Sequence, residues 1–150
     1  MTDLQMLLDE REITRKLGRF ARVLDAKQWP RLSDVFASDL SFEYGQGERE
    51  GIAALEAQMR QYLDVCGPTQ HLLGSITVDV DGDVAVSRAY VQARHQRRDD
   101  PVGAIFDSTG EYVDRWQRRA EGWRIVRREA TWFLHSGDPA VLATDIGSLG

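Results

Sequence analysis

At residue 69 the hydrophobic pattern of this 150-residue chain changes from a helical period to a period of two. Apolar and polar side chains then alternate over residues 69–80, 84–97, 106–119 and 122–134, which predicts four long strands. Short turns at 81–83 and 119–122 join two pairs of these runs, and a longer loop at 99–103 separates the pairs. We therefore expect consecutive antiparallel strands.

The residues before position 69 have helical spacing instead. A helix is predicted over residues 3–24, with Asp3 as a possible cap and an apolar stripe of Leu4, Leu7, Leu8, Ile13, Leu17, Phe20, Val23 and Leu24. Trp29 and Pro30 begin a second, short helix, residues 39–44 alternate as a strand, residues 45–48 form a loop, and residues 51–65 form a third helix.

Helices followed by consecutive strands predict an α+β fold, in which N-terminal helices pack on one face of a curved, mostly antiparallel sheet. A strongly bent sheet against a helix forms a cone with an internal cavity, which is a natural ligand site. We expect one domain over residues 1–150, with an ordered core at about 3–135 and a partly mobile tail at 136–150.

Composition excludes several classes of protein. The single cysteine, Cys66, rules out an internal disulfide, and the net charge of −5 argues mildly against nucleic acid as a partner. Neither a secretory signal nor an apolar run long enough to span a membrane is visible, so we expect a cytoplasmic location. The arginine clusters alternate with acidic residues, which is typical of solvated faces and ion pairs.

The candidate catalytic pair is His71 with Asp25. Histidine exchanges a proton near neutral pH, and His71 lies at the start of a predicted strand, where the backbone is well ordered. Asp25 follows the first helix near the edge of its apolar stripe, where a carboxylate needs a partner. A carboxylate that binds one imidazole nitrogen leaves the other free to act as a base. The alternative is a structural hydrogen bond without catalysis.

Other polar residues are weaker candidates. His95 alternates with Ala89, Val91 and Ala93, so it can face inward and donate to a substrate oxygen, or simply end its strand. Tyr44 and Tyr112 are possible donors, and His135 is expected at the surface. The histidines lack metal-ligand spacing, and no phosphate loop, dinucleotide motif or serine nucleophile elbow is present, so we expect no metal and no cofactor.

Landmarks along nearly the whole chain resemble the SnoaL-like group of the nuclear-transport-factor-2-like superfamily. They are residues 20–25, Trp29, Leu32, Phe36, Asp39, residues 69–71 with Gly74, residues 81–83 with Ala85, Gly110, Tyr112, Asp114 and residues 122–125. Within this group the sequence looks most like hexachlorocyclohexane dehydrochlorinase, scytalone dehydratase and bile-acid dehydratase.

The resemblance implies roles for particular residues. In those enzymes an aspartate at the end of the first helix orients a histidine that removes a proton, and Asp25 and His71 match that pair. Arg128 is the nearest match to an arginine that assists the dehydrochlorinase. Phe20 stands in the substrate site where some relatives place a lysine or tyrosine, so the sequence departs from the pattern there.

The function expected is that of a cofactor-independent lyase or isomerase acting on a small hydrophobic cyclic or aromatic substrate. Two alternatives are a non-catalytic module that binds a small molecule and a structural subunit like the small subunit of ring-hydroxylating dioxygenases. Tyr90, Val113 and Trp116 are expected on the open face of the sheet, where they would support a homodimer or homotrimer.

Overall fold

A computed structural model describes residues 2–100 and 102–142. Its elements are α1 (Asp3–Ala26), the 3₁₀ helix η1 (Trp29–Asp34), β1 (Phe36–Glu43), β2 (Glu48–Glu50), α2 (Ile52–Leu63), β3 (Cys66–Asp81), β4 (Val84–Arg97), β5 (Ile105–Arg119), β6 (Gly122–Gly137) and the 3₁₀ helix η2 (Pro139–Leu142). The α+β fold predicted from the sequence is confirmed. No helix in these ranges has the length and apolar character needed to cross a membrane.

The six strands form one sheet in the order β2-β1-β6-β5-β4-β3. Strands β3 to β6 pair antiparallel with their neighbours in sequence, as predicted, and β1 joins β6 in parallel. Strand β2 lies partly in the stretch predicted as a loop, and it pairs antiparallel with β1. Strand β3 begins at Cys66 rather than at residue 69, because Cys66 already pairs with Arg97 of β4.

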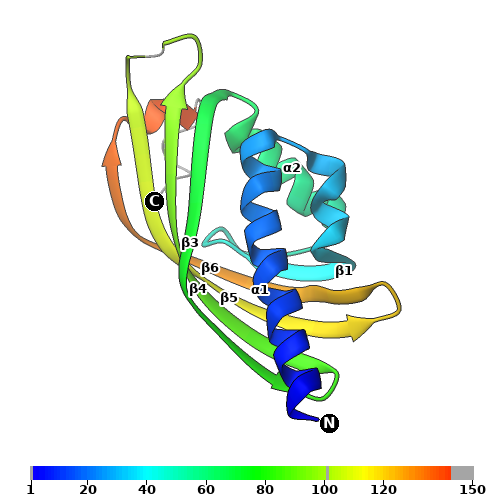
Figure 1. The fold of residues 1–150 in the computed structure, drawn as a ribbon. Coiled ribbons are helices and arrows are strands. Elements are labelled where there is room, and N and C mark those ends of the chain that lie inside the picture. Colours follow the sequence, from blue (N-terminus) through cyan, green and yellow to red (C-terminus); the bar gives the residue numbers. More distant parts are fainter. Residues whose placement is uncertain (1, 101, 143–150) are drawn as a thin grey trace.

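Figure 1 shows the long strands bending around α1, which lies across the inner face of the sheet. The pairing of β3 with β4 shifts register between Gly74 and Thr77, and Ser75 has a left-handed backbone with φ of 48°. An extra residue of this kind is a β-bulge, which bends a strand and increases its twist. The bend leaves one half of the sheet packed on α1 and opens the other half toward α2.

Helix α1 differs from the prediction at both ends. Its cap is Thr2 rather than Asp3, because the Thr2 hydroxyl accepts a hydrogen bond from the Gln5 backbone at 3.1 Å. The apolar stripe is buried from Ile13 onward, whereas Leu4, Leu7 and Leu8 are exposed. The helix also continues to Ala26, so its last turn includes position 25.

Side chains alternate strictly along the central strands. In β4, Ala85, Ser87, Ala89, Val91, Ala93 and His95 face the core. Trp116 of β5 also faces the core and is 1% exposed, so the prediction that it lies on the open face is wrong. The indole Nε1 of Trp116 donates to the hydroxyl of Ser87 at 2.8 Å, which satisfies it inside the protein. Tyr90 and Val113 do lie on the open face.

Regular secondary structure continues past residue 135 as far as residue 142. Strand β6 runs to Gly137, and η2 buries Val141 and Leu142 against Cys66 and Phe106. This packing closes the end of the sheet beside the open half of the cone. The remainder of the predicted tail, residues 143–150, lies outside the described residues.

Candidate active site

A cavity of about 420 Å³ lies between the helices and the open half of the sheet. Its walls come from the end of α1, the loop after β1, α2, strands β3 to β6 and η2. Most of the lining is apolar or aromatic, including Leu24, Met59, Phe106 and Trp132. None of the described residues in the lining is a lysine or arginine. This volume suits a small ring compound.

Asp25 and His71 meet at the wall of this cavity. The Nδ1 atom of His71 lies 2.7 Å from Oδ1 of Asp25, and the backbone N–H of His71 donates to Oδ2 at 3.1 Å. The hydroxyl of Thr69, two residues earlier on the same face of β3, donates to Oδ1 at 2.9 Å. The carboxylate therefore binds β3 at three points and fixes the orientation of the imidazole.

The end of α1 places Asp25 where it can make these bonds. Lys27 follows the helix in a left-handed conformation, with φ of 53°, and the backbone N–H of Gln28 donates to the carbonyl of Val23 at 3.0 Å. This is a Schellman ending, which ends the helix at Ala26. The Lys27 ammonium donates to the carbonyl of Cys66 at 2.8 Å, which ties the end of α1 to the start of β3.

The electrostatics keep Asp25 ionised and set the tautomer of His71. Burial alone raises the pKa of Asp25, but hydrogen bonds from His71 and Thr69 outweigh it and leave the pKa below its ordinary value. Since an ionised carboxylate only accepts hydrogen bonds, Nδ1 of His71 carries the proton. The lone pair of Nε2 is then available for a ligand, and the described residues provide no hydrogen bond to this atom.

His95 faces inward and lines the same cavity, with its ring 5.7 Å from that of His71. Burial lowers the pKa of His95 to about 4, so the ring is neutral at pH 7. Its Nδ1 lies 2.8 Å from the carbonyl oxygen of Phe106 and must carry the proton, because a carbonyl only accepts. The other ring nitrogen, Nε2, is thus an acceptor. The expectation that His95 donates to a substrate oxygen is wrong for this tautomer.

Arg128 does not line the cavity. Its side chain is fully buried, and Nε and Nη2 donate to the two carboxylate oxygens of Asp114 at 2.7 and 2.8 Å. Burial raises the pKa of Asp114, and the adjacent guanidinium opposes that rise. The remaining nitrogen, Nη1, contacts the hydroxyl oxygen of Tyr44 at 3.4 Å. Arg128 therefore reaches the cavity through Tyr44, as a positioning residue.

Tyr44 and Tyr112 both line the cavity, as expected, and their ring centroids lie 6.3 Å apart. Burial raises the pKa of each hydroxyl, so both remain protonated and can donate. Tyr112 is 2% exposed, and its hydroxyl has no hydrogen bond to the described residues. Phe20 lies behind Tyr112, with ring centroids 5.8 Å apart, and is not in the lining, so the expectation that it binds substrate is not met.

Several lining residues were missed in the sequence. His135 is exposed, as expected, but it lies at the cavity and its Nδ1 is 3.0 Å from the hydroxyl of Ser108. Ser108 lies on the same face of β5 as Tyr112, four residues away, and strand alternation could have found it. Gln58 and Tyr62 are one turn apart on α2 and also line the cavity. In the described residues, no group of three His, Cys, Asp or Glu side chains could hold a metal ion.

Comparisons with known proteins agree with this architecture. The uncharacterized protein Rv2910c of Mycobacterium tuberculosis is 30% identical over 135 residues, which is 87% of this chain and 90% of that protein. A candidate scytalone dehydratase of Novosphingobium aromaticivorans superposes with a TM-score of 0.81 at 23% identity, covering 92% of each chain. A hexachlorocyclohexane dehydrochlorinase, LinA type 2, superposes with a TM-score of 0.79 at 16% identity, covering 91% of this chain and 93% of that one.

The two structural neighbours share the fold of this chain. An NTF2-like protein with a cystatin-like fold from Novosphingobium aromaticivorans also superposes, with a TM-score of 0.74 at 26% identity, covering 93% of this chain and 90% of that one. The sequence itself matches the SnoaL-like domain over residues 5–129, a range that includes α1, α2 and the strands that form the cavity. This protein belongs to the SnoaL-like domain family.

Proposed function

We propose that this protein is a cofactor-independent lyase or isomerase that removes a proton from carbon in a small, largely apolar ring compound. The observation that carries the proposal is the 2.7 Å contact between His71 Nδ1 and Asp25, which leaves Nε2 as a free lone pair at a mostly apolar cavity. A neutral imidazole oriented by a carboxylate is a general base.

The proposed reaction begins when His71 Nε2 takes a proton from a carbon next to a carbonyl or a leaving group. Asp25 stabilises the imidazolium that forms. In an elimination, the electron pair of the C–H bond becomes a C=C bond, and the leaving group departs with the electrons of its own bond. In an isomerisation, the imidazolium returns the proton to another carbon. General-base catalysis of this kind contributes about 10²–10⁴-fold in rate.

Tyr44 is the donor best placed to stabilise the negative charge that develops. Its hydroxyl oxygen contacts Nη1 of Arg128, and its own O–H is free to donate to an oxygen or halide in the cavity. Tyr112 offers a second unpaired O–H at the same wall. Donors that are already oriented in an apolar site stabilise developing charge more effectively than water does.

The structural neighbours support this reaction class. One is named a hexachlorocyclohexane dehydrochlorinase and another a candidate scytalone dehydratase, and both names describe eliminations. Their identities to this chain are below 25%, so the proposal of proton abstraction rests on the geometry of Asp25 and His71 here.

The test is turnover of a panel of cyclic alcohols, halides and ketones. We expect His71→Ala to reduce turnover by at least 10²-fold and Asp25→Asn to be nearly as severe, since the variant carboxamide no longer stabilises an imidazolium. Asp79→Asn makes the same chemical change at an exposed site on β3 and should keep full activity. Circular dichroism verifies that each variant is folded.

Full activity in His71→Ala or Asp25→Asn would reject the assignment. Wild-type protein that binds members of the panel without turnover would instead support the alternative of a non-catalytic small-molecule-binding module.

A further inference from the structure

Gln58 is a buried polar residue whose side chain has no partner in the protein. It lies on the inner face of α2, is 3% exposed and lines the cavity. Within the described ranges its carboxamide forms no hydrogen bond or other polar contact. A carboxamide carries two N–H donors and a carbonyl acceptor, so all of its hydrogen-bonding capacity is unused.

Among the described residues, the other buried polar side chains are paired, except for the hydroxyl of Tyr112, which lines the same cavity. Asp9 accepts bonds from Arg118 and Trp123, and Ser87 accepts one from Trp116. Burying a polar group without a partner costs free energy, so native proteins rarely leave one unsatisfied. The neighbours of Gln58 on α2, Leu55 and Met59, show that an apolar residue fits this helix face. A glutamine here therefore needs a reason outside the folding of the chain.

We propose that Gln58 is a specificity-determining residue whose carboxamide hydrogen-bonds an uncharged polar group of the ligand, such as a hydroxyl or carbonyl oxygen. This inference rests on the proposed function only in taking the cavity as the substrate site. Gln58 and His71 lie on different walls, α2 and β3. The group that Gln58 recognises is therefore separate from the carbonyl or leaving group beside the carbon that His71 deprotonates.

The charges around the cavity disfavour an anionic group. The lining includes Glu43 and Glu129 and has no lysine or arginine among its described residues. A carboxylate or phosphate would have no lysine or arginine in the described part of this lining to compensate it, since Arg127 already pairs with Glu129 at 3.0 Å, and desolvating it would be unfavourable. A neutral oxygen avoids this cost and still satisfies the carboxamide.

The experiment compares two ligands in wild-type protein and in Gln58→Met, which keeps the unbranched shape and removes the hydrogen-bonding atoms. The ligands are 1-tetralone and 6-hydroxy-1-tetralone, which differ by one hydroxyl group. Titration calorimetry should show that wild type binds the hydroxylated compound about tenfold more tightly, as expected for one net hydrogen bond. In Gln58→Met this preference should fall to about onefold. Gln92→Leu, on the exposed face of β4, should keep it.

The Tm of Gln58→Met without ligand is a second readout. A structural role for Gln58 and a role in ligand binding predict opposite changes in this Tm. If Gln58 serves the ligand, Gln58→Met removes an unsatisfied buried group and should raise Tm by several degrees. A lower Tm in Gln58→Met would overturn the proposal. So would a wild type that does not prefer the hydroxylated ligand, or a Gln58→Met variant that keeps the preference. If Gln58→Met loses the preference and wild type turns over no member of the panel, the lyase assignment is rejected and the role of Gln58 in binding is retained.

Discussion

At the scale of single residues, Arg128 shapes the site from a position behind its wall. Its guanidinium lies 4.0 Å from the ring centroid of Tyr112 and 4.2 Å from that of Phe20. These cation–π contacts and the paired bonds to Asp114 hold it in one orientation. The same orientation brings Nη1 to the hydroxyl of Tyr44, so a buried ion pair positions a donor in the cavity.

Breaking this ion pair should be costly. Asp114→Ala leaves the Arg128 charge buried without a partner and should lower the free energy of unfolding by about 3–5 kcal/mol, measured by urea denaturation. Asp107→Ala removes an aspartate from the same strand, but its partner Arg94 is exposed, so stability should change little. Equal losses in the two variants would contradict this account.

Asp9 makes stability depend on acid pH. Hydrogen bonds from Arg118 lower its pKa from 3.8 to about 2 in the folded protein, so the unfolded chain binds the proton more readily. Its contribution, about 2 kcal/mol, is complete above pH 4 and is lost as the pH falls toward 2. The difference in unfolding free energy between wild type and Asp9→Asn should therefore shrink across that range. A difference that does not vary with pH would contradict the assignment.

The sequence predicted some site residues and missed others for identifiable reasons. Asp25 and His71 were expected to pair because of their residue types, their places at element ends and the family resemblance, and the structure places them in contact. The positions of Gln58 and His135 in the cavity depend on how α2 and the end of β6 close over it. Nothing local in the sequence encodes that closure. The orientation of Arg128 likewise depends on Asp114, fourteen residues away on a neighbouring strand.

At the scale of secondary-structure elements, the bulge in β3 gives the sheet its bend. Ser75 has φ of 48°, a conformation that costs an ordinary residue about 1–2 kcal/mol. Ser75→Gly should therefore stabilise the protein by up to about 1 kcal/mol, and Ser75→Val should destabilise it by about 1 kcal/mol.

Urea denaturation measures both effects, and Thr77 supplies the control. Thr77 is exposed in the same strand without a positive φ, so Thr77→Gly should destabilise the protein by about 0.5–1 kcal/mol. Glycine would then raise the free energy of unfolding at position 75 and lower it at position 77. Destabilisation by glycine at both positions would show that the bulge is not strained.

The long strands were predictable because their side chains alternate over twelve or more residues. Strand β2 was not, since Glu48, Arg49 and Glu50 are all exposed and carry no alternation. The first helix was predicted, but its N-terminal leucines were wrongly included in the buried stripe. Helical spacing shows which residues share a face, and it does not show where the sheet beneath that face ends.

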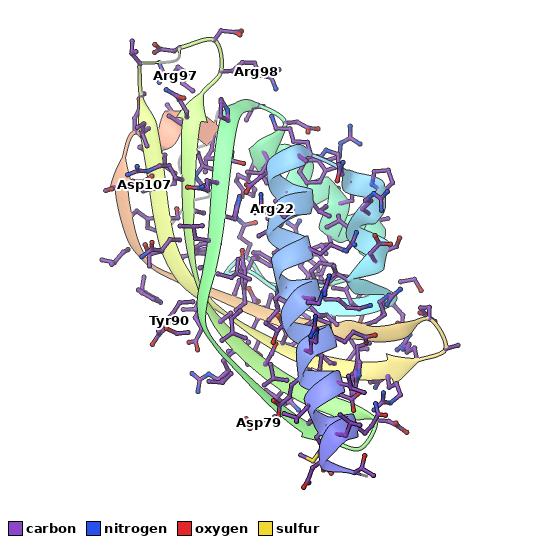
Figure 2. All side chains as sticks on the ribbon, viewed as in Figure 1. Arg22, Asp79, Tyr90, Arg97, Arg98 and Asp107 are labelled. Atoms are coloured by element: carbon purple, nitrogen blue, oxygen red, sulfur yellow. The ribbon has the colours of Figure 1, made fainter. Side chains whose placement is uncertain are left out.

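At the scale of the whole molecule, the outer face of the sheet carries four apolar side chains that are each more than half exposed, Leu72, Tyr90, Phe133 and Leu134. Figure 2 shows Tyr90 on the side of the sheet turned away from α1. The rings of Tyr90 and Phe133 are 6.4 Å apart, so residues from β4 and β6 contribute to one surface. We propose that this surface mediates a homodimer or homotrimer, because exposed apolar patches mark interaction sites.

Light scattering after size-exclusion chromatography tests the assembly. Wild type should elute as a dimer or trimer, and the double variant Tyr90→Glu, Phe133→Glu should be a monomer with an unchanged circular dichroism spectrum. Val102→Glu places the same charge at a loop residue that is 95% exposed and should leave the assembly intact. A monomeric wild type would rule out the proposal.

The central claim is that His71, oriented by Asp25, removes a proton from carbon inside the cavity. Deuterium incorporation at the carbon beside the carbonyl of a cyclic ketone in D₂O, followed by NMR, measures this step without requiring knowledge of the leaving group. The account predicts exchange catalysed by wild type and by Asp79→Asn, with a loss of at least 10²-fold in His71→Ala and Asp25→Asn. Exchange at the wild-type rate in His71→Ala would contradict it.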